Sequence, residues 1–188
     1  MTPGLPELLA SAQYTLFETR TGSCGIAWTE SGLVRVQLPE ATAAHTEARV
    51  QRPGATRCDD VLPDFIVSCR AMIQRYFDGE RETFDGIALD TANVSPFNAA
   101  IYAALRTIAW GQITTYGALA ELAGAPGTAR AVGAAMASNP WPIIVPCHRV
   151  LAASNQIGGF SARGGADTKR ALLTLEGVRL DPPSLWDF

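Results

Sequence analysis

The character of the chain changes near its middle, and this change limits the folds that the chain can adopt. Before residue 91 the apolar residues partly alternate and are interrupted by glycines, whereas after residue 96 they lie in alanine-rich stretches with helical spacing. The segment between, TANVSP (91–96), is polar and contains a proline, as linkers often do. We therefore predict two domains, residues 1–92 and 93–188, without an internal repeat.

The first half has the pattern of a small α+β domain. YTLFETRTGSCGIAWTESGLVRVQLP (14–39) predicts two or three short antiparallel strands, with breaks at Gly22, Gly25 and Gly32. LPDFIVSCRAMIQRYF (62–77) has apolar residues at three- and four-residue spacing, which indicates an amphipathic helix with Cys69 on its buried face. TFDGIALD (83–90) predicts a further strand. The predicted N-terminal domain is a small antiparallel sheet plus a helix.

The second half predicts helices. SPFNAAIYAALRTIA (95–109) begins with a serine N-cap followed by proline, and TTYGALAELAG (114–124) and TARAVGAAMASN (128–139) follow it. The last two are joined by a tight turn, as in a helix-turn-helix, although ordinary helix bundles contain such pairs too. We predict a mainly helical, winged helix-turn-helix-like C-terminal domain.

The helix predicted over 128–139 carries little side-chain bulk. Arg130 is its single charged residue, and most of the others are alanine, glycine or serine. Such a helix lets its backbone come close to whatever lies against it. Two interpretations stay open at this point: packing against a neighbouring helix, or close approach to a nucleic-acid groove with Arg130 reaching in.

Composition narrows the functional classes. No apolar run approaches the roughly 18 residues of a membrane span, and the N-terminus lacks the pattern of a signal peptide, so we expect a soluble, cytoplasmic protein that does not bind membranes. Four cysteines without a CxxC pair, and only two histidines, predict free thiols and no metal site.

Residues 1–96 hold 8 basic and 13 acidic residues (8 − 13 = −5), and residues 97–188 hold 7 and 5 (7 − 5 = +2). An anionic ligand such as DNA would therefore meet the second half.

The stretch IIVPCHRV (143–150) places a reactive side chain where a core segment ends. IIV predicts a buried strand that stops at Pro146, which has no N–H to donate. Cys147 follows, and an imidazole near a thiol favours the nucleophilic thiolate. Since neighbours on an extended chain point to opposite faces, His148 reaches Cys147 only if the backbone turns or a water bridges them. A buried structural cysteine is the alternative.

A protonated His148 needs a carboxylate to balance it. The candidates in the second half are Glu121, Asp167, Glu176, Asp181 and Asp187. Glu176 is favoured because it lies in the apolar stretch ALLTLEGV (171–178), where a carboxylate usually has a partner. A Cys–His–acid site would also fit a cysteine hydrolase, although no oxyanion-hole loop is evident.

Several segments together resemble one protein family. NPWPIIVPCHRV (139–150), RAVGAAM (130–136) and LLTLEG (172–177) resemble the O6-alkylguanine-DNA alkyltransferases, also called methylated-DNA–protein-cysteine methyltransferases. LPDFIVSCRAMIQRYFDGERETFD (62–85) resembles the N-terminal domain of this family more loosely. The resemblance implies direct-reversal DNA repair without a cofactor: an alkyl group passes irreversibly from O6-alkylguanine in duplex DNA to the protein, once per molecule, after the nucleotide is flipped out through the minor groove.

The resemblance also implies catalytic roles. Cys147 would accept the alkyl group, with His148 as a water-mediated base and Glu176 completing the relay. Asn139 would tie the preceding helix to the active-site loop, and Tyr116 would crowd the 3′ phosphate and donate a proton to the base.

Arg130 would be the finger that fills the space of the flipped nucleotide. The other expected DNA contacts are Thr115, Ala129, Ala131, Gly133 and Ala134. The expected substrate pocket comprises Met136, Arg149, Val150, Phe160 and Ser161. The carbonyl oxygens of Cys147 and Val150 would accept from the guanine amino group, and the Ser161 N–H would reach O6.

Some residues depart from the family pattern. Phe160 stands where many relatives have tyrosine, and Trp141 replaces a smaller residue that we place at the pocket rim, so the pocket size is expected to differ. The structural zinc of some relatives needs two histidines, but His45 is the only one in the first half. We expect the protein to be a monomer. Its expected partner is double-stranded DNA that contains O6-alkylguanine. The alternative is a non-catalytic sensor of alkylated bases, although relatives of that kind lack the cysteine.

Overall fold

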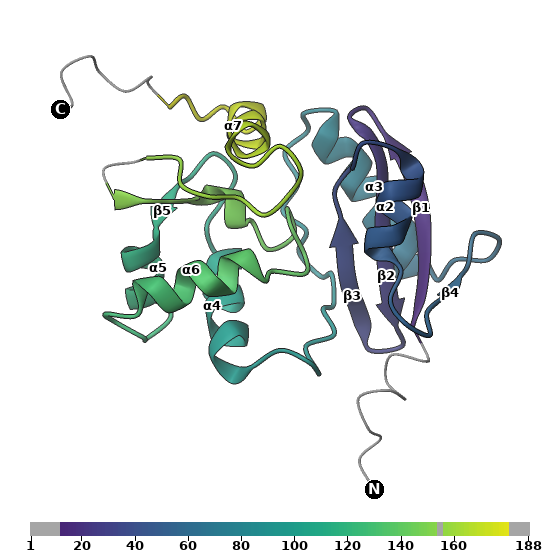
Figure 1. Cartoon of the computed structure of the whole chain (residues 1–188), viewed down its shortest axis with the longest axis horizontal. Coiled ribbons are helices and arrows are strands. Elements are labelled where there is room, and N and C mark those ends of the chain that lie inside the picture. The colour runs from purple at the N-terminus through teal and green to yellow at the C-terminus, as the bar shows by residue number, and fades with distance from the viewer. Residues whose placement is uncertain (1–11, 154–155, 181–188) are drawn as a thin grey trace, which may run out of the picture.

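The computed structural model describes residues 12–153 and 156–180, and the candidate acids Asp181 and Asp187 lie outside these ranges. Figure 1 shows two parts side by side, a sheet with its helices and a mainly helical part. They share one continuous apolar core, to which Phe17 and Ile73 contribute from the first part and Leu119 and Val132 from the second. The predicted fold class, an α+β domain followed by a mainly helical one, is confirmed.

The N-terminal sheet is built from two tight hairpins. Strands β1 (Gln13–Thr19), β2 (Gly22–Thr29) and β3 (Gly32–Gln37) are antiparallel, as predicted. The break expected at Gly25 is wrong, because this residue lies inside β2 and pairs with Leu16 of β1. Gly32 opens β3 at φ +139, where a Cβ atom would lie 2.7 Å from the Ala88 carbonyl oxygen, so a side chain is excluded there. The short strand β4 (Thr56–Arg57) pairs in parallel with β1. The sequence had predicted a purely antiparallel sheet, so this pairing is a difference.

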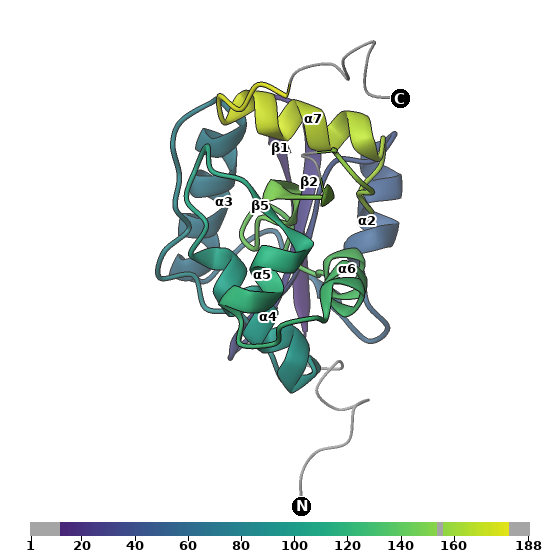
Figure 2. The same cartoon turned by 90° about the vertical axis from the view of Figure 1, so that its left-hand side faces the viewer.

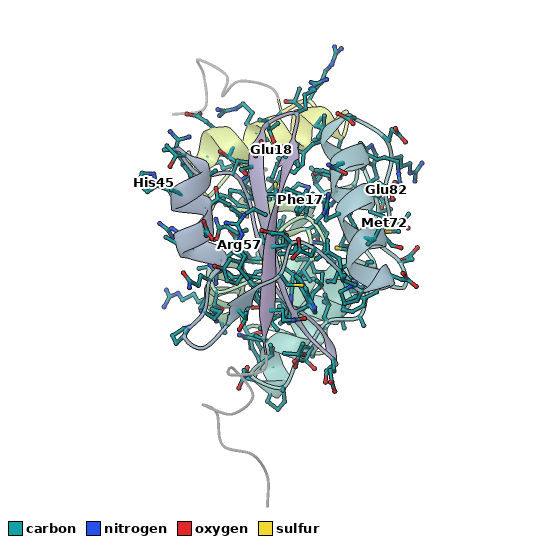
Figure 3. The ribbon with its side chains drawn as sticks, turned by 90° about the vertical axis from the view of Figure 1, so that its right-hand side faces the viewer. Phe17, Glu18, His45, Arg57, Met72 and Glu82 are labelled. Carbon is teal, nitrogen blue, oxygen red and sulfur yellow. The ribbon has the colours of Figure 1, made fainter. Side chains whose placement is uncertain are left out.

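Two helices cover opposite faces of this sheet. Helix α3 (Asp64–Phe77) matches the predicted helix and buries Cys69 in the main core, whereas α2 (Ala43–Val50) covers the face of Tyr14 and Ala27. Figure 3 shows His45 of α2 and Met72 of α3 on the two sides of the strands. Helix α2 was not predicted because half of its eight residues are polar and it buries only Thr46 and Val50.

The strand predicted over residues 83–90 is wrong. This segment contains turns and makes a single parallel bridge, between Leu89 and Leu33. Phe84 (φ +56) and Gly86 (φ +77) both have positive φ angles, which interrupt an extended conformation.

The C-terminal part contains the predicted helices as α4 (Pro96–Arg106), α5 (Tyr116–Leu122) and α6 (Ala129–Ala137), followed by α7 (Ala166–Leu175). Ser95 caps α4 by accepting from the Asn98 N–H. Strands β5 (Thr114–Thr115) and β6 (Val150–Leu151) form a small parallel pair. Figure 2 shows α7 running across the top of the molecule to the end of α3.

The strand predicted for residues 143–145 is also wrong. These residues form a buried turn in which Ile143 has φ +68, and Cys147–Arg149 form a 3-10 helix. The isoleucines and valine are apolar because they lie in the core, not because they belong to a sheet. Cys147 therefore begins a short turn of helix, and the backbone turns between Cys147 and His148.

Within the described residues, no helix is both long and apolar enough to cross a membrane.

Candidate active site and DNA interface

Cys147 borders a cavity beside helix α6. Its side chain is almost completely buried, with 5% of the residue exposed, and the cavity volume is about 260 Å³. Of the predicted pocket residues, Met136, Phe160 and Ser161 line this cavity. The turn of residues 141–149, which contains Cys147, is called the active-site turn below. The full lining of the cavity comes from α5, α6, this turn and the loop before α7: Tyr116, Gly133, Met136, Ala137, Cys147, Gly159, Phe160 and Ser161.

His148 and Glu176 form a completely enclosed pair. His148 Nε2 lies 2.7 Å from Glu176 Oε1, and neither side chain is exposed. The ionised carboxylate accepts hydrogen bonds only, so Nε2 carries the proton and Nδ1 keeps its lone pair. Nδ1 is buried and has no hydrogen-bond partner within the described residues. This arrangement leaves a neutral imidazole with a free acceptor next to Cys147 in the chain.

Glu176 is held by several donors. Arg149 binds it through two hydrogen bonds, Nε to Oε2 at 2.8 Å and Nη2 to Oε1 at 2.9 Å, and the Gly111 N–H reaches Oε2 at 3.3 Å. The Tyr76 hydroxyl donates to Oε1 at 2.9 Å. Burial by itself raises the pKa of Glu176, but the hydrogen bonds from His148 and Arg149 outweigh it and lower the pKa to about 2. Glu176 is therefore a fixed negative charge at neutral pH.

Two predicted pocket residues do not border the cavity. Arg149 binds Glu176 and also donates to the Ile108 carbonyl oxygen at 2.5 Å, so its guanidinium balances the carboxylate. The Val150 carbonyl oxygen accepts from Lys169 Nζ at 2.5 Å, which occupies one of its two lone pairs. Trp141, predicted at the pocket rim, is buried and packs edge-on against Tyr102. The resemblance to the family had implied these three pocket positions, and none of the three residues lines the cavity.

Lys169 is an unexpected component of this region. It comes from α7, is completely buried and donates to Val150 as described. Burial lowers its pKa to about 8, and the interaction with Cys147 acts in the opposite direction. The sequence did not indicate that Lys169 is buried, because lysines in a helix with several polar residues are usually exposed.

Cys147 is a protonated thiol at rest. Burial raises its pKa above the ordinary value, while a hydrogen bond from Asn139 and the charge of Lys169 partly offset this. Burial also lowers the pKa of His148, against the opposing effect of Glu176, so that the imidazole is neutral near pH 7. Thiolate formation therefore requires a proton acceptor during the reaction.

Asn139 and Tyr116 lie where they can shape the site. Asn139 follows α6; its Nδ2 donates to the Val145 carbonyl oxygen at 2.8 Å and its Oδ1 accepts from the Trp141 N–H at 3.0 Å, which ties α6 to the active-site turn. Tyr116 begins α5 and lines the cavity. Thr115, predicted as a DNA contact, caps α5 by accepting from the Ala118 N–H.

Helix α6 presents a face of small side chains to solvent. Arg130, Ala131 and Ala134 are exposed and Ala129 is partly exposed, whereas Val132, Ala135 and Met136 are buried. A Cβ atom added at Gly133 would meet no atom within 4 Å, so internal packing does not require glycine there. The two earlier interpretations of this helix therefore divide by face: one face packs internally, and the small outer face is open.

No group of three or more histidine, cysteine, aspartate or glutamate side chains lies close enough together to hold a metal ion in the ranges that the structure describes. Cys24 and Cys69 are buried, and burial raises the pKa of each to about 12.

The fold and the site define a class of protein in which a buried cysteine lies at a cavity, next in the chain to a histidine that is paired with a buried carboxylate, and beside a helix with an open face of small residues. Residues 96–178 match the family described as "6-O-methylguanine DNA methyltransferase, DNA binding domain", and residues 13–91 match "6-O-methylguanine DNA methyltransferase, ribonuclease-like domain". The chain therefore belongs to the methylated-DNA–protein-cysteine methyltransferases, a family of DNA-repair enzymes, and the resemblance seen in the sequence is confirmed.

Individual relatives agree with this assignment. The rat methylated-DNA–protein-cysteine methyltransferase is 31% identical over 188 residues, covering 94% of this chain and 87% of the relative. The crystal structure of Mycobacterium tuberculosis OGT in complex with DNA has a TM-score of 0.72 at 34% identity, covering 87% of this chain and 92% of that one. O6-methylguanine-DNA methyltransferase from Pyrococcus kodakaraensis has a TM-score of 0.65 at 26% identity, covering 89% and 99%.

Proposed function

We propose that this protein repairs duplex DNA by transferring the alkyl group of O6-alkylguanine to Cys147, once per molecule. The observation that carries the proposal is the position of the thiol at a cavity, next to a neutral His148 whose Nδ1 is buried without a partner. The family assignment supports the same reaction class.

The proposed reaction is a displacement at the alkyl carbon. Cys147 Sγ forms a bond to this carbon while the bond between the carbon and guanine O6 breaks, and the electron pair of that bond passes to the guanine. His148 Nδ1 takes the thiol proton, through a bridging water, and Tyr116 supplies a proton to the guanine. The imidazolium proton then passes through solvent to the Tyr116 phenolate, so the net result is a thioether, an unmodified guanine and both protein groups in their starting forms. A thioether does not hydrolyse readily, so one molecule acts once.

The raised pKa of Cys147 makes the neutral base necessary. A buried thiol with a raised pKa contains little thiolate at pH 7, so proton removal has to accompany the attack. The imidazolium that forms is balanced by the buried Glu176 carboxylate. Charge is thereby moved within an enclosed network, without water having to solvate it.

Delivery of the base requires the nucleotide to leave the duplex, because guanine O6 lies inside the base stack. Extrusion costs about a few kcal/mol, and a side chain wedged into the duplex offsets part of it. We assign this role to Arg130 on the exposed face of α6. The small residues Ala131, Gly133 and Ala134 would let the helix approach the groove closely, with contacts that do not read sequence.

The test is the intact mass of the protein after mixing with a duplex that carries one O6-methylguanine. We expect a gain of one methylene unit that saturates at one per protein, located in the peptide of Cys147. The Cys147→Ala variant should show no gain yet bind DNA. The matched control is Cys58→Ala, which removes a half-buried thiol in the N-terminal domain and should transfer normally.

The outcomes separate the alternatives. Binding of the duplex without any mass gain would favour a sensor of alkylated bases. Repeated turnover without a stable adduct would favour a hydrolase. A gain on Cys147→Ala would overturn the assignment of the nucleophile.

A further inference from the structure

Tyr76 brings a hydroxyl group from the N-terminal domain into the catalytic pair. It lies on α3 and is completely buried. Its hydroxyl donates to Glu176 Oε1 at 2.9 Å and lies 3.3 Å from His148 Nε2, across 100 and 72 residues of chain. Figure 2 shows why this is possible: the end of α7, just before Glu176, meets the end of α3, where the nearest atom to an added Gly79 Cβ is Leu175 Cδ1.

The ring of Tyr76 is fixed by its aromatic neighbours. Phe77 and Trp110 pack edge-on against it with centroid distances of 5.5 and 5.3 Å, and Phe84 lies at 5.8 Å. The hydroxyl therefore has a set position, in which the carboxylate is its acceptor. Burial and the negative charge of Glu176 raise the pKa of Tyr76 well above its ordinary value, so the hydroxyl keeps its proton.

Three donors converge on one oxygen of Glu176. Oε1 accepts from the Tyr76 hydroxyl, from His148 Nε2 and from Arg149 Nη2 at 2.9, 2.7 and 2.9 Å. Each hydrogen bond to the carboxylate stabilises its charged form and so lowers its affinity for a further proton. Tyr76 therefore limits how strongly Glu176 attracts a proton on His148.

We infer that Tyr76 is a positioning residue for alkyl transfer: it holds the Glu176 carboxylate in line with His148 Nε2 and keeps the His148 imidazole in the neutral form with its Nδ1 lone pair free. The inference rests on the proposed function, in which His148 Nδ1 receives the thiol proton. It assigns to the N-terminal domain a positioning part in the C-terminal site, exerted through Glu176.

The groups that face His148 set its proton affinity together. Glu176, which follows α7, favours the charged imidazole. Arg149, next to His148 in the 3-10 helix, and Lys169 of α7 disfavour it. Tyr76 of α3 acts through Glu176. Replacing Tyr76 with phenylalanine leaves the ring and removes one donor from Oε1. The carboxylate then holds the imidazolium more strongly, and a larger fraction of His148 is charged at neutral pH.

The test compares Tyr76→Phe with Tyr14→Phe in the full chain. Tyr14 is a matched control because it is buried in the same domain and its hydroxyl also donates to a carboxylate, Glu47 Oε1 at 3.1 Å, away from the site. We expect the transfer rate constant of Tyr76→Phe at pH 7 to fall on the order of tenfold, equally with duplex substrate and free O6-benzylguanine. The acid limb of its pH–rate profile should move to higher pH, while Tyr14→Phe should match the unmodified protein.

A second readout does not depend on catalysis. The chain has only two histidines, so ¹⁵N-imidazole spectra resolve His148, with the exposed His45 as an internal reference. We expect His148 to be protonated at Nε2 only, and Tyr76→Phe to begin protonating Nδ1 at a higher pH. If Tyr76→Phe folds poorly, 3-fluorotyrosine at position 76 keeps the packing, strengthens the donor and should move the acid limb to lower pH.

Unchanged rates, pH profile and imidazole spectra in Tyr76→Phe would overturn the inference and leave Tyr76 as a core residue. Failure of the proposed function is distinguishable, because the unmodified protein would then form no adduct at Cys147 while the imidazole spectra still report on Tyr76.

Discussion

The indole N–H of Trp141 donates to the carbonyl oxygen of Leu33 at 2.8 Å, across 108 residues of chain. The Val36 N–H donates to the Pro140 carbonyl oxygen at 2.8 Å beside it. These bonds fasten the segment before Cys147 to β3, an edge strand of the N-terminal sheet. The edge of that sheet is thereby covered, and the active-site turn has a rigid support outside its own domain.

Removing the charge of Glu176 is expected to cost both stability and activity. Glu176→Gln leaves Arg149 buried without its counter-charge, and breaking a buried ion pair in this way costs about 3 kcal/mol or more. Urea denaturation measures the loss. Asp167→Asn is the matched control, because its pair with Arg170 is exposed and its removal should leave the free energy of unfolding unchanged. Equal stability of Glu176→Gln and the unmodified protein would contradict the role of this network.

Stability is expected to fall in acid because of Glu176. Its pKa is about 2 in the folded protein and 4.5 as an ordinary carboxyl, so between these values the unfolded chain binds more protons. The stabilisation is complete above pH 4.5 and is lost as the pH falls towards 2. Urea midpoints measured from pH 6 to pH 2 should show this decline, and the decline should be smaller in Glu176→Gln. An identical acid dependence in the two proteins would argue against it.

Lys169 should produce a pH dependence of the same sign in the alkaline range. Its pKa is lowered from 10.5 to about 8 by burial, so between these values the unfolded chain again binds more protons and stability rises with pH. Other groups also titrate in alkali, so the comparison with Lys169→Met isolates this contribution. The difference in unfolding free energy between the two proteins should change between pH 8 and pH 10.5. A constant difference would mean that Lys169 has an ordinary pKa.

Arg130→Ala is expected to impair repair of duplex DNA selectively. Loss of the wedge should slow transfer from duplex O6-methylguanine by about tenfold or more, because extrusion of the base is no longer offset. Transfer from free O6-benzylguanine should change little. Arg170→Ala removes the same charge from an exposed site on α7 and serves as the control. Equal losses with both substrates would count against the finger role.

Gly133→Ala distinguishes the two interpretations of α6. Since no atom lies within 4 Å of an added Cβ, alanine should raise the stability of the helix by about 0.5–1 kcal/mol. If the small face approaches DNA, the same change should weaken binding to duplex DNA. Thermal denaturation and a DNA titration at fixed salt measure the two effects. Higher stability with unchanged DNA affinity would show that the glycine does not serve close approach.

Sequence reasoning succeeded where the signal is local. Residues close together in the chain encode each of the correctly predicted features: the hairpins at Gly22 and Gly32, the Ser95 cap, and the helical spacing of residues 64–77. It failed at residues 143–145, an apolar stretch that is buried as a turn, and at residues 83–90, where only Phe84 and Ile87 are buried and two positive φ angles interrupt the extended conformation. A short apolar segment has the same composition whether it is buried as a turn or forms a strand. The spacing of its apolar residues therefore could not distinguish the two structures. The domain boundary at 92/93 and the catalytic roles stay predictions.

The sequence by itself determined the family and the fold class and indicated Cys147 as the candidate nucleophile, because PCHRV and its companion segments are contiguous motifs. Only the tertiary structure decided how the site is held. It joins His148 to Glu176, assigns Arg149 to that carboxylate, and brings Lys169 and Tyr76 to the same place from other helices. The physical reason is that a buried charge must find donors wherever the chain places them, and partners up to 100 residues apart leave no pattern in the sequence.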